Sequence, residues 1–549
     1  MRPLSPLTAL FATMLLASDV FAGSTPAVAV SPKALQLVRL IAVQHDGRHK
    51  PFDSFAMEIL AQVTGAPRIG RADPVATVLS IMAEPERWQD APLLSIPFVP
   101  LREALGMSRK ATHASYNELI ASRKLMRLLP DIVAKQQRDE KLSMLENETM
   151  DAFQRFVSLS RLFEQHVELV PPPEGSPDRS WLPILQPQGY AAEPQLALRN
   201  GWTGLIEAIR SGEASSVEAS AAQLAQVLRA ANPSAYPASW RLRLEVFYNH
   251  AGPFRIARVF YLIGAIGFLL SLMARARWGV PTGWGGLVAG YAIHGAGIAM
   301  RVVLGGRPPV SNFFETMLWL PFVAVTLGLI FERLYRIRYA GLGAALLAAL
   351  TLFLADYVPL DSSIVPVVAV LRSNLWLTVH VLTIVASYGA LALATVAAHV
   401  YGTLYLMGGR KHPALIALDL YLYRTIQVGV VLLAGGVMLG AVWANASWGR
   451  YWGWDPKETW ALITLLWFLA ILHGRFAGWI RGVGVALSTI GGFLLLLVTY
   501  YGVSFYLVGL HSYAGGHAKP LPSLLIGYLV LEAVFVAWVA AAALRRRVA

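Results

Sequence analysis

Residues 376–400 read WLTVHVLTIVASYGALALATVAAHV, and this stretch contains no Asp, Glu, Lys or Arg. About 20 apolar residues suffice to cross the hydrocarbon core of a bilayer as a helix, so we predict a membrane-spanning helix here. Eight further segments have a similar length and composition, at about residues 255–273, 284–304, 314–331, 340–357, 424–443, 459–476, 483–507 and 523–544. The predicted fold is therefore mainly α: a polytopic α-helical membrane protein with about nine transmembrane helices.

The overall composition supports this fold class. Only 14% of the 549 residues are charged, whereas a soluble globular protein carries about 25%. Residues 1–253 hold 25 basic and 25 acidic side chains, and residues 254–549 hold 21 basic and 8 acidic ones. The low charged fraction excludes a soluble enzyme and a disordered chain. The whole net charge of +13 comes from the apolar half, which is typical of a membrane protein. Since no clustered basic face is visible, we expect no nucleic-acid partner.

The basic residues between the predicted spans orient the chain. Thirteen fall on one side: Arg275, Arg277, Arg333, Arg336, Arg338, Arg410, Lys411, Arg424, Arg475, Arg481, Arg545, Arg546 and Arg547. The opposite loops hold five: Arg307, Arg372, Arg450, Lys457 and Lys519. Because cytoplasmic loops are enriched in Lys and Arg, we expect the thirteen to face the cytoplasm. The predicted location is a bacterial inner membrane, with the loops of the other side in the periplasm.

The N-terminal half is expected to be exported. Residues 1–22 resemble a signal sequence, with Arg2, an apolar stretch from Leu7 to Leu16 and a small-residue cleavage site ending at Ala22; an uncleaved N-terminal anchor is the alternative. Residues 23–253 form the predicted periplasmic soluble domain, which is mostly helical and shows no clean strand alternation. Helices are expected over Leu101–Asn147 and Leu205–Ala231, and a linker or subdomain break at Pro171–Pro187. Residues 254–549 form the predicted transmembrane domain.

The chain contains no cysteine. This excludes a disulfide framework, a thiolate metal site, a cysteine nucleophile and a covalent haem site of the Cys-x-x-Cys-His type. Any thiol chemistry must use the thiols of a partner. Any metal must be held mainly by histidine, carboxylate, methionine or tyrosine.

The loop between the sixth and seventh spans is the most unusual stretch. Residues 448–460 read WGRYWGWDPKETW and include Trp448, Tyr451, Trp452 and Trp454. Aromatic residues are enriched at bilayer interfaces, so a membrane-interface belt is one interpretation. The glycines between the aromatic residues favour the other, a platform for a large, flat ligand. The following Asp455 and Pro456 are typical of an N-cap and the first helical turn.

If the flat molecule carries a metal ion, four histidines are candidates to coordinate that ion. His380 and His511 lie at the outer ends of the fifth and eighth predicted spans, at the level of the tryptophan-rich loop. His294 and His473 lie inside predicted spans, where ionisable groups are costly and often functional. We predict an outer pair, His380 with His511, and a second pair, His294 with His473, toward the cytoplasm. Arg301 and Glu532 are unexplained charges within spans; they pair with each other or with a ligand.

The stretch WGRYWGWDPKETWALI at residues 448–463 resembles the tryptophan-rich WWD motif of haem-handling proteins in cytochrome c assembly. It is more similar to the CcsA (ResC) branch than to the CcmC or CcmF branches. Supporting segments are Pro309–Asn312 with Glu315, Ser373–Trp376 before His380, Leu472–Arg475, Tyr501–Val503 and Gly509–Tyr513. The resemblance covers about residues 285–515. Val43–Asp53 also resembles a stretch of extended bacterial CcsA-like proteins.

The resemblance implies a component of a two-component cytochrome c synthase, or haem lyase. Such proteins move haem b to the outer face of the membrane and present it to apocytochrome c. It implies that His380 and His511 are the outer axial ligands and that Trp448, Trp452, Trp454 and Asp455 present the haem. It also implies that His473 is the family's membrane histidine; His294 as its partner is an inference from position. The implied partners are a CcsB/ResB-like membrane protein, apocytochrome c and a thiol-reducing thioredoxin-like protein.

Two other functions remain open from the sequence. One is a haem exporter or chaperone without ligase activity, which would share the tryptophan-rich loop and the histidines. The other is a transporter of another hydrophobic substrate, which would predict inverted internal repeats that the sequence does not show.

Overall fold

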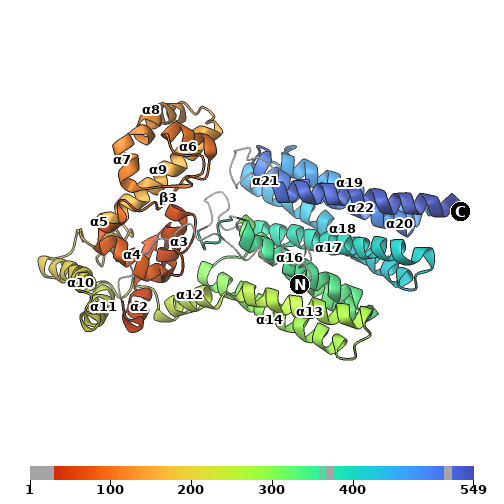
Figure 1. The fold of residues 1–549 in the computed structure, drawn as a ribbon, viewed down its shortest axis with the longest axis horizontal. Coiled ribbons are helices and arrows are strands. Elements are labelled where there is room, and N and C mark those ends of the chain that lie inside the picture. Colours follow the sequence, from red (N-terminus) through yellow and green to blue (C-terminus); the bar gives the residue numbers. More distant parts are fainter. Residues whose placement is uncertain (1–29, 359, 367–374, 512–521, 549) are drawn as a thin grey trace, which may run out of the picture. The chain divides into compact units, whose positions relative to one another are not determined.

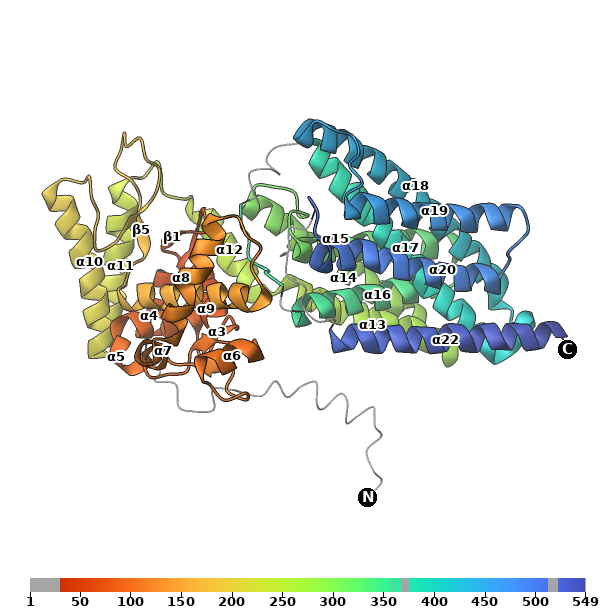
Figure 2. The same ribbon diagram turned by 90° about the horizontal axis from the view of Figure 1, so that it is seen from above.

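The computed structural model describes residues 30–358, 360–366, 375–511 and 522–548. The predicted signal sequence or anchor at residues 1–22 lies outside the described residues. The chain divides into two compact units, residues 1–249 and residues 250–549. Figures 1 and 2 show the helices and strands of each unit.

The first unit is mainly helical. Its helices are α2 (Pro32–Arg39), α3 (Phe52–Thr64), α4 (Pro74–Ala83), α5 (Pro85–Trp88), α6 (Val99–Leu105), α7 (Tyr116–Ser122), α8 (Lys124–Gln137), α9 (Met144–Phe163), α10 (Ala192–Ser211) and α11 (Ala214–Ala231), followed by α12 (Ser239–Ala251) at its boundary. Three small antiparallel sheets pair β1 (Ala42–His45) with β2 (Arg48–Pro51), β3 (Leu94–Ser95) with β4 (His113–Ala114), and β5 (Glu168–Val170) with β6 (Leu182–Pro183). A continuous apolar core joins these elements.

The β1–β2 hairpin connects the start of this unit to its end. Its two-residue turn is Asp46-Gly47, and both residues have positive φ, which is typical of the type I′ turn that suits a twisted hairpin. The Arg48 guanidinium donates to both carboxylate oxygens of Glu245 on α12, at 2.6 and 2.7 Å. Ser54 also donates to Glu245, at 2.6 Å. The segment that resembles extended CcsA-like proteins is thus a hairpin fastened to α12.

Three sequence predictions for this unit are wrong in detail. Leu101–Asn147 is divided among α6, α7, α8 and the start of α9, because Gly106 ends α6 with φ of 78° and strand β4 follows. Leu205–Ala231 is two helices, since Gly212 ends α10 with φ of 71°. Pro171–Pro187 is no linker: it contains β6 and the buried residues Trp181 and Ile184.

The second unit is a helical bundle. Among the described residues, nine helices are long and apolar enough to cross a membrane, which confirms the predicted polytopic α-helical fold. Its elements are α13 (Pro253–Met273), α14 (Gly279–Gly305), α15 (Phe313–Tyr335), α16 (Tyr339–Tyr357), α17 (Leu375–Gly408), η2 (Gly409–Lys411), α18 (Ala414–Trp448), α19 (Pro456–Phe476), α20 (Val483–Leu497), the π-helical turn η3 (Val498–Gly502), α21 (Val503–Tyr506) and α22 (Ser523–Val548).

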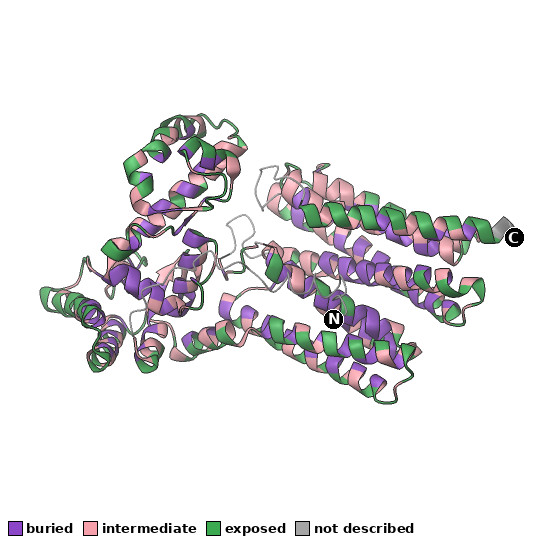
Figure 3. Cartoon of the chain, in the orientation of Figure 1, coloured by how far each residue is buried: buried purple, intermediate pink, exposed green. Residues whose placement is uncertain are grey.

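Burial within the bundle differs from helix to helix. α17 is the most enclosed span and packs on α18, α20 and α15. α22 is the least enclosed, and Figure 3 shows exposed residues along much of it. Successive spans alternate in direction, so the ends of α14 and α18 and the starts of α15, α17 and α19 lie at one end of the bundle. We call this the Trp-loop end, after the loop at residues 449–455.

Glycines set the close packing of α13 against α14. A Cβ atom at Gly286 would lie 2.4 Å from the backbone nitrogen of Gly264, and one at Gly283 would lie 2.8 Å from the Phe268 ring. Small residues of this kind let the backbones of membrane helices approach closely, where packing and not water drives association. The neighbouring Gly285 has nothing within 4 Å of its would-be Cβ atom.

This difference gives a matched pair of variants. Gly286→Leu should destabilise the bundle by about 1–3 kcal/mol or more, because the added side chain must push two backbones apart. Gly285→Leu should leave stability unchanged. The apparent melting temperature of the detergent-purified protein measures both, and equal melting temperatures would contradict the packing described for α13 and α14.

Candidate functional site

His380 lies in the second turn of α17 and faces the last third of α18. Its Nδ1 atom is 2.8 Å from the backbone carbonyl oxygen of Gly436. A Cβ atom at Gly440, one turn later, would lie 2.7 Å from Cε1 of His380. The glycine at position 440 therefore makes the space in which the imidazole fits against α18.

His511 is held by Asp455. Its Nδ1 atom lies 2.9 Å from Oδ1 of Asp455, and the backbone N–H of Leu510 donates to Oδ2 at 2.6 Å. A Cβ atom at Gly509 would lie 2.4 Å from the same oxygen, so the approach of this segment requires glycine. Asp455 thus joins the start of α19 to the segment that follows α21.

Asp455 is also the N-cap of α19, as the sequence predicts. Its side chain accepts from the backbone N–H of Lys457, Glu458 completes a capping box, and Pro456 occupies the first turn. Burial alone raises the pKa of the Asp455 carboxyl, but hydrogen bonds from His511 and from backbone N–H groups outweigh it, and the pKa is lowered from its ordinary value. The group is therefore a carboxylate at neutral pH, and it can only accept hydrogen bonds.

These acceptors fix the tautomer of both histidines. A carbonyl oxygen and a carboxylate have no proton to give, so Nδ1 carries the proton in His380 and in His511. In its neutral form, each imidazole then has its lone pair on Nε2, the atom that can bind iron. Histidines that bind metals almost always donate their other N–H to a carboxylate or a backbone carbonyl, which sets the orientation of the ring. The donor set therefore fits bis-histidine ligation.

Trp443 lies against both histidines, and sequence reasoning missed it. Its ring stacks on that of His380, with centroids 6.1 Å apart and an interplanar angle of 9°, and its centroid is 5.8 Å from that of His511. The side chain is 1% exposed, and its indole N–H has no hydrogen-bond partner among the described residues. The sequence does contain a pattern that could have indicated it. Gly436, Gly440 and Trp443 are spaced so that they lie on one face of a helix.

The predicted tryptophans fall into two groups. Trp448 belongs with the histidines, since its ring lies 5.2 Å from that of His511 and 4.7 Å from that of Trp443. Trp452 and Trp454 pack edge to face on each other, 5.7 Å apart. Trp454 is 70% exposed and Tyr451 61%, so these rings offer accessible aromatic surface at the Trp-loop end.

His294 and His473 have different surroundings. His294 is fully buried, its Nδ1 lies 3.1 Å from the Tyr261 hydroxyl, and its ring contacts are with Phe254 and Tyr261 of α13 and Phe322 of α15. His473 is exposed in the last turn of α19, where Nδ1 bonds to the Leu469 carbonyl oxygen at 2.8 Å. α14 packs mainly on α13, α15 and α16, whereas α19 packs on α18 and α20. The structure does not bring these two histidines together.

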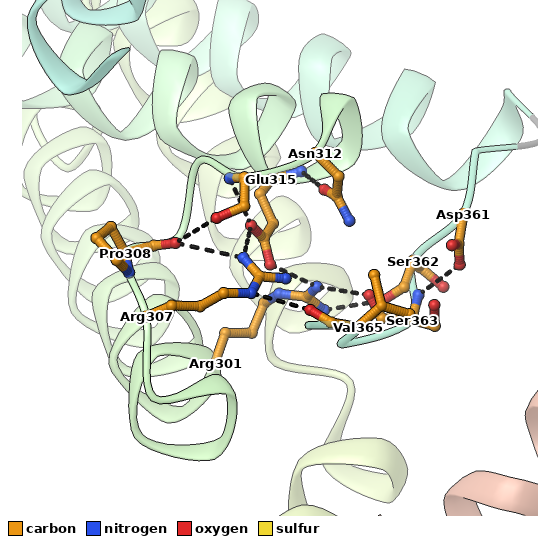
Figure 4. Close-up of polar contacts among 10 residues, drawn as sticks. Arg301, Arg307, Pro308, Asn312, Glu315, Asp361, Ser362, Ser363 and Val365 are labelled. Carbon is orange, nitrogen blue, oxygen red and sulfur yellow. Dashed lines mark hydrogen bonds and ion pairs between the residues drawn. The ribbon is translucent and has the colours of Figure 1, made fainter. Parts of the chain in front are cut away.

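Arg301 pairs with Glu315 and not with Glu532, so the predicted Arg301–Glu532 pair is wrong. Figure 4 shows Arg301 and Arg307 converging on Glu315, with nitrogen–oxygen distances of 3.0 and 2.7 Å. Both guanidinium groups also donate to backbone carbonyls of residues 362–365, at 3.0 to 3.3 Å. The cluster ties this loop to α14 and α15.

Glu532 has a different partner within the bundle. Its carboxylate lies 3.1 Å from Nε2 of His399 on α17. Glu532 is 5% exposed although α22 is otherwise the least enclosed span. The pair is one polar contact by which α22 docks on α17, and Arg546, which donates to the Tyr405 and Leu406 carbonyl oxygens, is another. Polar residues commonly join membrane helices in this way.

The comparisons with known proteins concern the same part of the chain. A family model described as "Cytochrome C assembly protein" matches residues 310–511, which include His380, Asp455 and His511. The chain is 34% identical to cytochrome c biogenesis protein CcsA of Guillardia theta over 284 residues, which cover 46% of this chain and 92% of that protein. It is also 34% identical to CcsA of Synechococcus sp. over 291 residues, covering 95% of that protein.

A longer relative includes the N-terminal unit. The chain is 28% identical to Protein NrfI of Wolinella succinogenes over 510 residues, which cover 88% of this chain. The chain spans only about half of NrfI, 54% of its length. By its fold, its matching region and the extent to which it covers its CcsA relatives, the chain belongs to the cytochrome c assembly family as a CcsA-type cytochrome c biogenesis protein.

Proposed function

We propose that this protein binds haem b as a substrate at the Trp-loop end and presents it for covalent attachment to apocytochrome c. The observation that carries the proposal is the pair His380 and His511, each with Nδ1 bonded to an acceptor and both in contact with Trp443. Two imidazoles whose Nδ1 atoms are bonded to acceptors can each offer Nε2 as an axial ligand for haem iron. The family's role in cytochrome c biogenesis agrees with this assignment.

The surroundings suit a flat, apolar macrocycle. Trp443 and Trp448 line the histidine pair, Trp454 and Tyr451 supply exposed aromatic faces in the same loop, and the half-buried Trp452 packs against Trp454. Aromatic faces offer a large apolar contact area at low entropic cost. We propose that these rings hold the porphyrin while the two imidazoles hold its iron.

Attachment of haem to the client depends on how the vinyl groups and the client thiols are oriented, and it needs no nucleophile from this chain. A cysteine thiol of the client adds across a haem vinyl group: sulfur bonds to one vinyl carbon, the thiol proton ends on the other, and no electrons are exchanged with a third species. This chain contains no cysteine, so it supplies no competing thiol. Its contribution is to place vinyl groups and thiols together, which alone can provide several powers of ten in rate.

The second haem position would use His473. This imidazole is exposed on α19 at the end opposite Asp455, on a span that is mostly unburied within the chain. We propose that a CcsB-like membrane partner covers it and contributes the other ligand, in place of the His294 pairing expected from the sequence. Apocytochrome c and a thioredoxin-like thiol reductant complete the proposed partners, with the Trp-loop end and residues 23–253 in the periplasm.

The axial ligands can be tested singly. His380→Ala or His511→Ala should convert a six-coordinate low-spin haem spectrum to a five-coordinate one and abolish covalent cytochrome c formation. Added imidazole should restore part of the low-spin spectrum and part of the cytochrome c yield, because it fills the vacant axial position. Asp455→Asn keeps an N-capping oxygen but removes the charge that orients His511, so it should weaken the low-spin signal without unfolding α19.

His412→Ala serves as the control, since His412 lies in the turn between α17 and α18 at the other end of the bundle. Visible spectra and the yield of haem-stained cytochrome c measure these outcomes. Wild-type spectra and yields for both axial variants would contradict the ligand assignment.

The edge-to-face pair Trp452 and Trp454 gives a second test. Replacing Trp452 and Trp454 together by Ala removes up to about 2–3 kcal/mol of burial per ring if both cover the porphyrin, and haem retention should fall by orders of magnitude. The double Phe variant should retain part of it, because a flat face remains. The measurement is haem absorbance per mole of purified protein. If the wild type, the double Ala variant and the double Phe variant have equal haem content and cytochrome c yield, the pair does not bind haem and belongs to a membrane-interface belt.

A further inference from the structure

Lys457 places a positive charge beside the histidine pair. It is the second residue of α19, and its backbone N–H donates to Asp455 Oδ1, the same oxygen that lies 2.9 Å from Nδ1 of His511. Its Nζ donates to the Ser504 hydroxyl at 2.9 Å and to the Tyr500 carbonyl oxygen at 3.3 Å. Both partners are neutral oxygens.

No carboxylate contacts this ammonium directly, although the charge of Asp455 acts on it from a greater distance. Among the residues that the structure describes, no Asp or Glu oxygen lies within 4.0 Å of Nζ in the way that pairs Arg301 with Glu315. The carboxylate of Asp455, two residues earlier, accepts hydrogen bonds from His511, from the backbone N–H of Leu510 and from the backbone N–H of Lys457. An ammonium carries three N–H donors, and two have acceptors here, so one remains for a ligand.

The position of Lys457 disfavours a cation, and the one nearby carboxylate, Asp455, is bonded to other groups. The first turn of a helix carries a partial positive charge, which stabilises anions and disfavours cations. A cation there, partly shielded from water by the π-helical turn η3 and α21, gains most from a bound negative group. Ser504 and Tyr500 hold the ammonium in place without neutralising it.

We propose that the Lys457 ammonium binds a carboxylate at the edge of the porphyrin that His380 and His511 hold. This inference rests on the proposed function and assigns the polar end of the same site. Haem carries two propionate carboxylates on one edge of an otherwise apolar ring. A single cation beside the axial histidines would set the rotation of the ring in its plane, and therefore the direction in which the vinyl edge faces the client.

The test compares haem with its dimethyl ester, in which both carboxylates are masked. Soret absorbance titrations of the full-length, detergent-purified protein give the two dissociation constants. The wild type should bind haem at least about tenfold more tightly than the ester, the range expected for a hydrogen bond to a charged group. Lys457→Met should bind both equally well, at the level of the ester.

Two variants separate charge from packing. Lys457→Gln can keep polar contacts to Ser504 and Tyr500 without the charge, and it should also lose the preference. Lys457→Arg should retain it, as should Arg450→Met, which removes an exposed cation from the same loop. The low-spin spectrum with the ester reports an intact histidine pair in each variant, because the ester needs the histidines and not the ammonium.

The outcomes distinguish the two proposals. A wild type without preference for haem, or a full preference in Lys457→Met and Lys457→Gln, would overturn the role of Lys457 while the low-spin spectra still support haem ligation. A wild type that gives no six-coordinate spectrum with either compound would overturn the proposed function and this inference together.

Discussion

The carboxylate of Asp455 is the interaction on which the Trp-loop end depends. With two oxygens it caps α19, accepts the N–H of Leu510 and accepts Nδ1–H of His511. Each contact has a different consequence: the cap starts the span, the backbone bond brings in the segment after α21, and the imidazole bond sets a tautomer. Removing the whole side chain would therefore disturb the start of α19, the segment after α21 and the orientation of His511 together.

The same end of the bundle shows how packing positions chemistry in a membrane. A side chain at position 440 would collide with His380, so the glycine there leaves room for the imidazole, and Trp443 on the next turn packs beside it. The Arg301–Glu315–Arg307 cluster lies at this end too and fastens the loop at residues 362–365. Thr316 of α15 donates to or accepts from the Tyr500 hydroxyl at 2.7 Å, which connects that helix to the turn that holds Lys457.

The spans could be predicted from the sequence because a bilayer imposes a length on every apolar helix. The Asp455 cap was visible because its partners are local in sequence. By contrast, the breaks at Gly106 and Gly212 escaped a periodicity argument, since one residue in the left-handed region ends a helix without changing the pattern around it. The partners of Arg301 and His294 depend on which helices are neighbours, and no local pattern contains that information. Trp443 was missed because a buried aromatic residue in an apolar span is expected wherever helices pack.

The central claim is that His380 and His511 together bind haem iron. The most direct measurement is the low-temperature electron paramagnetic resonance spectrum of the oxidised, haem-loaded protein, with His473→Ala as background so that only the Trp-loop end contributes. The account predicts a low-spin ferric signal typical of two axial imidazoles, and its conversion to a high-spin signal in the His473→Ala/His511→Ala double variant. A high-spin signal in the first protein, or a low-spin signal that survives in the second, would contradict it.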